Sequence, residues 1–192
     1  MEIIKSVNLC GIKPYIPYST RKTGISTVYK GMGTYNDGDL LSGYELVYGR
    51  EAAIKDFLSR VKNPHSLEKL EWLAVEHFLF SLGYRSVGIS FTRNMDFAKE
   101  WAMERKDDLE LETKRKDRCS SNPINRIECQ SRATLIIAEI PNEYLISIVD
   151  VRRKRPEYFK ARLPNEARTH EEDDMVFFGS LEKGCFEVHF LE

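Results

Sequence analysis

The chain has 192 residues, of which 42% are apolar and 31% charged, and its 29 Lys and Arg nearly balance its 30 Asp and Glu to leave a net charge of −1. This composition predicts one folded domain with a full core, and it excludes the low hydrophobicity and high net charge of a disordered chain. The balanced charge also excludes a globally basic surface for nucleic acid or anionic membranes. Any electrostatic function must come from local clusters of charge.

The sequence has no sign of export, membrane insertion or metal binding. Its N-terminus lacks a basic segment followed by a long apolar stretch, and no apolar run approaches ~20 residues. We therefore expect no signal peptide and no membrane span, and a location in a cytosol, either that of the producing cell or that of a host that receives the protein. The cysteines form no C-x-x-C pair and have no histidine at ligand spacing, so we expect reduced thiols and no metal (Cys10, Cys119, Cys129, Cys185).

The first half of the chain contains one predicted strand and two predicted helices. Ser26–Tyr29 is β-branched and aromatic, as is typical of a short strand. Apolar residues at spacings of three and four predict a helix over residues 50–61. Ser66 is the expected N-cap of a second helix, whose broad apolar face predicts burial and which Gly83 is expected to end.

The middle of the chain is predicted to contain a strand, a helix and an insertion. Residues 87–92 indicate the strand, which leads into a helix near Met95–Arg105. Residues 106–131 then lose the apolar pattern and contain charge clusters and a Ser-Ser-Asn-Pro run. Because such long segments without a core pattern are often functional or disordered, we expect a mobile loop insertion here.

The last third of the chain is predicted to be mainly strands. Residues 133–140 form a continuous apolar run that indicates a strand buried on both faces. We expect another strand at Tyr144–Val151, a basic loop at Arg152–Pro164, and two closing strands at Asp174–Gly179 and Phe186–Phe190. Helices early and strands late favour an α+β fold over a parallel α/β sheet.

Three short segments carry the residues that suggest chemistry. Tyr29-Lys30-Gly31 ends the first strand, Ser90-Phe91-Thr92 lies on the strand before a helix with an alanine and a tryptophan, and Glu171–Asp174 leads into an apolar strand. Because side chains alternate along a strand, Ser90 and Thr92 point to one side, and Glu172 and Asp174 would also share a side. The last pair places two carboxylates together.

The order of these segments resembles the mono-ADP-ribosyltransferases of the cholera-toxin-like, Arg-Ser-Glu class. In that family a strand ends in Tyr-Arg-Gly or similar, Ser-Thr-Ser opens a strand before a helix, and an acidic pair precedes a valine and a downstream glycine. The resemblance extends from about Val28 to Phe186. This chain is a divergent match: the arginine falls on Lys30, Ser-Thr-Ser on Ser90-Phe91-Thr92, and the catalytic glutamate on Asp174, with Glu172 as the other candidate.

The resemblance implies a single domain over residues 1–192, folded as a split β-sandwich of two small sheets around a cleft with helices packed in the N-terminal half. It implies NAD as a substrate and no metal. Asp174 or Glu172 would stabilise an oxocarbenium-like transition state, Lys30 would hold the pyrophosphate, and the other NAD-binding residues would line the same cleft between the two sheets (Tyr29, Gly31, Ser90, Phe91, Thr92).

Two functions remain open from the sequence. The first is a transferase that moves ADP-ribose from NAD to a macromolecule, with protein as the expected acceptor, and that acts as a toxin, effector or host modifier. The second is a binding module, either a catalytically degenerate form of this fold or an unrelated α+β domain. It would bind an acidic protein or nucleic acid through two basic clusters, residues 114–118 and 152–155.

Overall fold

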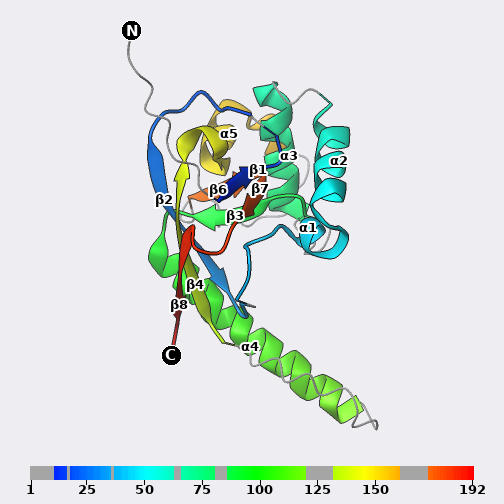
Figure 1. Ribbon diagram of the computed structural model, residues 1–192, viewed down its shortest axis with the longest axis vertical. Coiled ribbons are helices and arrows are strands. Elements are labelled where there is room, and N and C mark those ends of the chain that lie inside the picture. Colours follow the sequence, from blue (N-terminus) through cyan, green and yellow to red (C-terminus); the bar gives the residue numbers. More distant parts are fainter. Residues whose placement is uncertain are drawn as a thin grey trace.

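The computed structural model describes residues 11–16, 18–35, 37–62, 66–80, 86–119, 132–160 and 173–192, with the backbone alone at residues 80, 109–119 and 160 (Figure 1). Within these ranges the protein has a mixed α+β fold with two antiparallel sheets, one of six strands and one of two. The expected α+β class is therefore confirmed. None of the described helices is long and apolar enough to cross a membrane.

The strands come together from distant parts of the chain. The two-stranded sheet pairs β1 (Ile12–Pro14) with β7 (Gly179–Leu181). The six-stranded sheet has the order β5-β6-β3-β2-β4-β8, and its strands are β5 (Ile146–Ser147), β6 (Asp174–Phe177), β3 (Ile89–Thr92), β2 (Ile25–Met32), β4 (Thr134–Pro141) and β8 (Phe186–Phe190).

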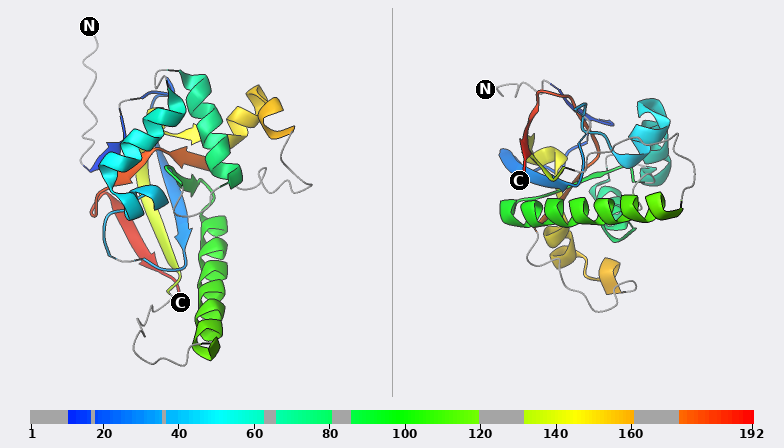
Figure 2. Two further views of the ribbon diagram at one scale, coloured as in Figure 1. Left: turned by 90° about the vertical axis from the view of Figure 1, so that its right-hand side faces the viewer. Right: turned by 90° about the horizontal axis from the view of Figure 1, so that it is seen from below.

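Helices surround this larger sheet. Of the α-helices in the described residues, three precede β3, as the sequence predicts for the N-terminal half, and three follow it. They are α1 (Gly43–Tyr48), α2 (Arg50–Val61), α3 (Leu67–Phe80), α4 (Met95–Cys119), α5 (Ile148–Lys154) and α6 (Glu157–Lys160). Figure 2 shows α4 alongside β2, against which it packs, whereas α3 contacts α5 and β6.

The larger sheet lies between two apolar cores because the side chains of its strands alternate. On β6, Val176 joins a core with Phe57 of α2 and other residues of α3 and α5. Its neighbours Met175 and Phe177 join a second core, which also contains Leu181 of the small sheet. All four residues of β6 are buried, so both cores depend on this strand.

The six-stranded sheet consists of two halves that meet at one residue pair. β2 pairs with β4 along its whole length, and β3 pairs with β6 from Ile89 to Thr92. Between β2 and β3, however, the register contains only Tyr29 opposite Thr92. The register between the halves β5-β6-β3 and β2-β4-β8 therefore consists of a single cross-strand pair.

Most of the predicted elements lie at or near their expected positions. Strand β2 covers the predicted Ser26–Tyr29, α2 matches residues 50–61, and β4 matches residues 133–140. The second predicted helix begins at Leu67, directly after Ser66, whereas its expected stop at Gly83 lies outside the described residues. The predicted strands over 87–92, 174–179 and 186–190 correspond to β3, to β6 with β7, and to β8.

The expected loop insertion at 106–131 is wrong over its first half. Residues 106–119 continue α4, which reaches 25 residues and runs past the end of the sheet in Figure 1. This segment contains no Gly or Pro and is rich in Lys, Arg, Glu and Leu, which favour helix. The part of a helix that extends beyond the rest of the protein packs against no core and needs no apolar face. The loss of apolar spacing after residue 105 therefore does not mark the end of α4. Residues 120–131 lie outside the described residues.

The expected strand at Tyr144–Val151 is also wrong. A 3₁₀ turn at Asn142–Tyr144 and the two-residue β5 lead into α5 at Ile148. The Oγ atom of Ser147 accepts a hydrogen bond from the backbone N–H of Asp150 and so caps this helix. Ile148 and Val151 are three residues apart and both enter the first core, which makes a helix the better way to bury this apolar run. Part of the expected basic loop, residues 152–154, therefore lies on α5.

Helix α4 approaches β2 closely because three small residues meet at their contact. A Cβ atom on Gly31 would lie 2.0 Å from the carbonyl oxygen of Ala98 and 2.8 Å from the backbone nitrogen of Ala102. Both alanines are buried. The close approach of α4 to β2 is thus possible only because Gly31 has no side chain.

We expect Gly31→Ala to destabilise the protein by about 2–3 kcal/mol, because the new methyl group collides with helix backbone that cannot move aside independently. Gly184→Ala is the control: Gly184 has a φ of 101°, but a Cβ there meets no atom within 4 Å. Its cost should come only from the left-handed backbone and be about 1 kcal/mol. Urea unfolding followed by circular dichroism measures both. Equal losses in the two variants would contradict the close contact.

Candidate functional site

A cavity of about 460 Å³ opens between the junction of the two half-sheets and the helices α3 and α4. Its strand residues come from β2, β3 and β6, and they are Tyr29, Lys30, Gly31, Ser90, Phe91, Thr92 and Asp174. Its helix residues are Phe78, Leu79, Phe97, Ala98, Trp101 and Arg105. The structure therefore brings together every candidate residue from the sequence except Glu172, which lies outside the described residues.

Three of the candidate side chains form a row across the sheet. Tyr29 on β2 lies opposite Thr92 on β3, and Thr92 lies opposite Asp174 on β6. Directly opposed residues of antiparallel strands point to the same face and contact each other. Thr92 and Asp174 are buried, at 4% and 9% exposure. The register thus places a carboxylate, a hydroxyl and a phenol side by side on the wall of the cavity.

The location of the cavity differs from the expected cleft between two separate sheets. All its strand residues belong to the six-stranded sheet, and the two-stranded sheet contributes none of the described lining. The physical reason is the single pair at Tyr29 and Thr92, which keeps the halves continuous. Helices α3 and α4 supply the rest of the lining.

Lys30 is the cationic side chain at this junction. Its Nζ atom donates a hydrogen bond to the carbonyl oxygen of Ser90 at 3.3 Å, which links β2 to β3. Burial of the ammonium group, together with the positive charge of Arg105, lowers the pKa of Lys30 from 10.5 to about 8. Among the described residues no carboxylate forms an ion pair with Lys30. Lys30 is therefore still charged at neutral pH, although burial and the nearby positive charge disfavour its ammonium form.

His77 is a buried residue beside the cavity that the sequence analysis did not single out. His77 lies on α3, and its Nε2 atom is 2.6 Å from the Oγ atom of Ser90. Its Nδ1 atom is hydrogen bonded to the hydroxyl of Ser86. Burial, and then the charge of Lys30, lower the pKa of His77 from 6.5 to about 3, so the ring is neutral at pH 7. The ring fixes the Ser90 side chain. Nothing in the sequence indicates this, because His77 and Ser90 come from different elements, thirteen residues apart.

An aromatic and cationic row on α4 faces the cavity. Phe97, Trp101 and Arg105 follow one another at four-residue spacing, so they lie on one side of the helix. The ring centroids of Phe97 and Trp101 are 6.3 Å apart, and the guanidinium carbon of Arg105 lies 4.7 Å from the centre of the Trp101 ring. The four-residue spacing of Phe97 and Trp101 continues to Arg105 in the sequence. This spacing could therefore have identified Arg105 as a residue on the same side of the helix.

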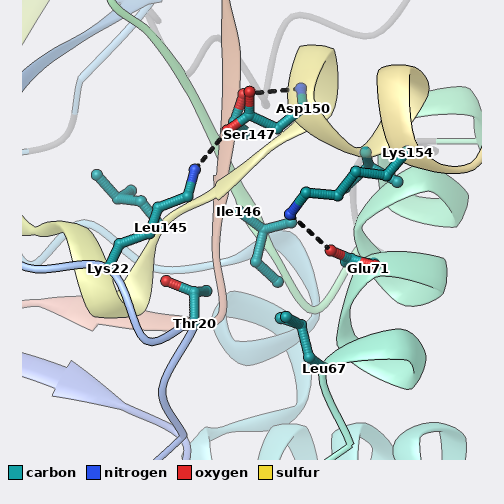
Figure 3. Close-up of a pocket in the computed structure, with 10 residues that line it drawn as sticks. Thr20, Lys22, Leu67, Glu71, Leu145, Ile146, Ser147, Asp150 and Lys154 are labelled. Atoms are coloured by element: carbon teal, nitrogen blue, oxygen red, sulfur yellow. Dashed lines mark hydrogen bonds and ion pairs between the residues drawn. The ribbon is translucent and has the colours of Figure 1, made fainter.

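A second cavity, shown in Figure 3, has room for about one water molecule. Its volume is about 20 Å³, and it lies between β5, α3 and α5. Lys22 pairs with Asp150 across it, and Lys154 lies 3.7 Å from Glu71. Arg155 also donates to Glu71, at 3.1 Å. The two contacts of Glu71 tie α3 to the end of α5 and neutralise part of the basic cluster at 152–155. The side chains of the cluster at 114–118 are not among those described.

The larger cavity combines chemical groups that suit one class of ligand. Comparisons with protein-family models, curated proteins and solved structures find no match to the chain. Two cations favour phosphate, aromatic rings favour a planar base, and a carboxylate beside hydroxyls favours a ribose. The described residues contain no group of three or more His, Cys, Asp or Glu side chains that could hold a metal ion.

We expect His77 to make the protein sensitive to acid. Its pKa is about 3 in the folded protein and 6.5 ordinarily, so the unfolded chain binds more protons between these values. Stability is therefore lost as the pH falls through this window, by about 2 kcal/mol between pH 6.5 and about pH 4.5. Urea unfolding at several pH values measures the loss.

In His77→Gln this part of the pH dependence should disappear, whereas His189→Gln, which replaces a histidine exposed at the surface, should retain it. A His77→Gln protein with the same acid sensitivity as the wild type would show that the buried ring is not its source.

Proposed function

We propose that the protein is an NAD-dependent mono-ADP-ribosyltransferase that modifies a macromolecule. The observation that carries the proposal is the convergence of three distant segments on one cavity. Tyr29, Lys30 and Gly31 from β2, Ser90, Phe91 and Thr92 from β3, and Asp174 from β6 all line it. These are the positions at which the chain resembles the Arg-Ser-Glu class of ADP-ribosyltransferases.

The arrangement of the sheet supports the same proposal. Two three-stranded halves share one registered pair, and the cavity lies at that junction. Such an arrangement fits an ADP-ribosyltransferase-like split β-sandwich. The second core, with Leu181 of the small sheet packed against the large one, supplies the layered character of a sandwich.

Asp174 is the proposed catalytic carboxylate. The reaction breaks the bond between the ribose C1′ and the nicotinamide nitrogen, and the bonding electrons leave with neutral nicotinamide. The ribose then carries oxocarbenium-like positive charge, which a nearby carboxylate stabilises. A nucleophilic atom of the acceptor bonds to C1′ and releases its proton to water or a neighbouring base. Burial of Asp174 strengthens its electrostatic effect, because the local dielectric constant is lower than that of water.

The other cavity residues would bind and orient NAD. Lys30 would contact the pyrophosphate, and the hydroxyls of Ser90 and Thr92 would orient the ribose and Asp174. His77 would hold Ser90 in one conformation. Tyr29 would contact the nicotinamide ring, since aromatic side chains stack on planar groups, whereas the side chain of Phe91 packs in the second core and would support the strand beneath.

The acceptor is proposed to be a macromolecule, with protein as the expected class, that meets C1′ at the mouth of the cavity. Water can take its place, so slow hydrolysis of NAD should occur without any target. Such an enzyme would act in a cytosol, as a toxin, effector or host modifier. Incubation of a cell lysate with the protein and NAD, followed by mass spectrometry for added ADP-ribose, tests the transfer directly and identifies the acceptor.

We expect Asp174→Asn to reduce nicotinamide release from NAD at least about 100-fold, because the neutral amide no longer stabilises the positive charge of the transition state. NAD affinity should change less, since in the ground state the positive charge lies on the nicotinamide ring rather than on the ribose. Chromatography of nicotinamide and calorimetry of NAD binding measure the two effects.

Asp173→Asn is the matched control, because Asp173 precedes Asp174, is 40% exposed and lies 3.6 Å from Arg93 rather than in the cavity lining. It should retain activity, and Asp174→Glu, which restores the family's residue, should retain a large part of it. Wild-type protein that binds no NAD and releases no nicotinamide at high concentration would overturn the proposed function.

We expect NAD affinity to fall as the pH rises through 8. The pKa of Lys30 is about 8, so the ammonium loses its charge above that value and the attraction for the anionic pyrophosphate is lost. The fall should approach about tenfold per pH unit above the pKa. In Lys30→Arg the guanidinium stays charged, so the affinity should be flat over the same range. In Lys30→Met it should be low and flat. Calorimetry of NAD binding at pH values around 8 measures all three, and a flat wild-type profile would exclude Lys30 from phosphate binding.

A further inference from the structure

Arg105 is a second cation in the cavity, and the sequence resemblance gives it no role. It lies on α4, two turns beyond Phe97, and its guanidinium carbon is 4.7 Å from the Trp101 ring centre. This cation–π contact with a half-buried indole restrains the guanidinium group. The side chain thus lies at the edge of the cavity, exposed to solvent and restrained by the indole.

Arg105 on α4 and Lys30 on β2 both line this cavity. In the part of the chain that the structure describes, neither cation forms an ion pair with a carboxylate. The charge of Arg105 is felt at Lys30, where it disfavours the ammonium form. Two like charges held this close raise the free energy of the empty cavity, and a ligand with two adjacent negative charges relieves the repulsion.

We propose that Arg105 and Lys30 together form a two-point site for a diphosphate group, with Arg105 supplying the bidentate contact that Lys30 cannot make. This proposal rests on the proposed function, because the pyrophosphate of NAD is the expected ligand. An ammonium meets a phosphate as a point charge, whereas a guanidinium offers two parallel N–H groups to two oxygens. The fork thus comes from α4 instead of from β2, and the site selects a diphosphate over a monophosphate.

The position of Arg105 depends on the contact between α4 and Gly31. Ala98 and Ala102 lie against β2, and Trp101 and Arg105 follow on the neighbouring side of the same helix. A shift of α4 away from the sheet would separate the two cations. The spacing between them is therefore set by buried backbone rather than by flexible side chains alone.

The test is calorimetric titration of the full chain with inorganic pyrophosphate, inorganic phosphate and NAD. The variants are Arg105→Gln, which removes the charge, and Arg105→Lys, which keeps the charge but removes the fork. Lys106→Gln is the matched control, since it removes a positive charge one residue away that is outside the cavity lining. Arg105 is exposed, so these changes should leave the fold intact, which thermal unfolding checks.

We expect the wild type to prefer pyrophosphate to phosphate. Arg105→Gln should weaken pyrophosphate and NAD roughly 10–100-fold, Arg105→Lys should have an intermediate effect, and Lys106→Gln should change affinity less than about threefold. Equal losses in Arg105→Gln and Lys106→Gln, or no preference for pyrophosphate, would overturn the two-point site.

The same experiment separates this inference from the proposed function. If the wild type binds NAD and releases nicotinamide but Arg105→Gln binds NAD equally well, the two-point site is wrong and the transferase proposal stands. If pyrophosphate binds through Arg105 but NAD is never hydrolysed, the diphosphate site stands and the transferase proposal is wrong.

Discussion

The pairing of Tyr29 with Thr92 is the constraint on which the site depends. One cross-strand pair joins two three-stranded half-sheets, and the strands on either side of it follow other partners. A longer ladder between β2 and β3 would occupy the backbone groups near Lys30 and Ser90 and leave no junction. Absence of the pair would separate Asp174 from Tyr29. The same contact therefore creates the cavity and aligns its polar wall.

Burial lowers the pKa values of the groups around this junction below those that the same groups have in water. Lys30 is a cation in a partly buried position near a second cation, and His77 is a ring kept neutral by burial. Neither contributes stability through its charge, because desolvation penalises the ionised form of each. Such perturbed groups cluster at functional sites more often than elsewhere. Here they occur on both sides of Ser90, to which both are hydrogen bonded.

The sequence predicts correctly those elements whose structure is determined by their own local residue pattern. Strand β4 has a continuous apolar run, and the three candidate segments keep their order along the chain. Helix α5 was not predictable, because an apolar β-branched run favours a strand locally and only the core and the Ser147 cap make it helical. His77 was not predictable either, because a single histidine on an apolar helix has no pattern that reveals a partner on β3.

The length of α4 has a mechanical consequence. Its first turns contact β2 and carry Trp101 and Arg105, and its later turns run past the end of the sheet (Figure 1). A helix behaves as a stiff rod, because its backbone hydrogen bonds connect each turn to the next. A load applied to the far end would therefore act as on a lever, with the small-residue contact at Gly31 as its pivot. The width of the cavity is then coupled to whatever the distal end of the helix touches.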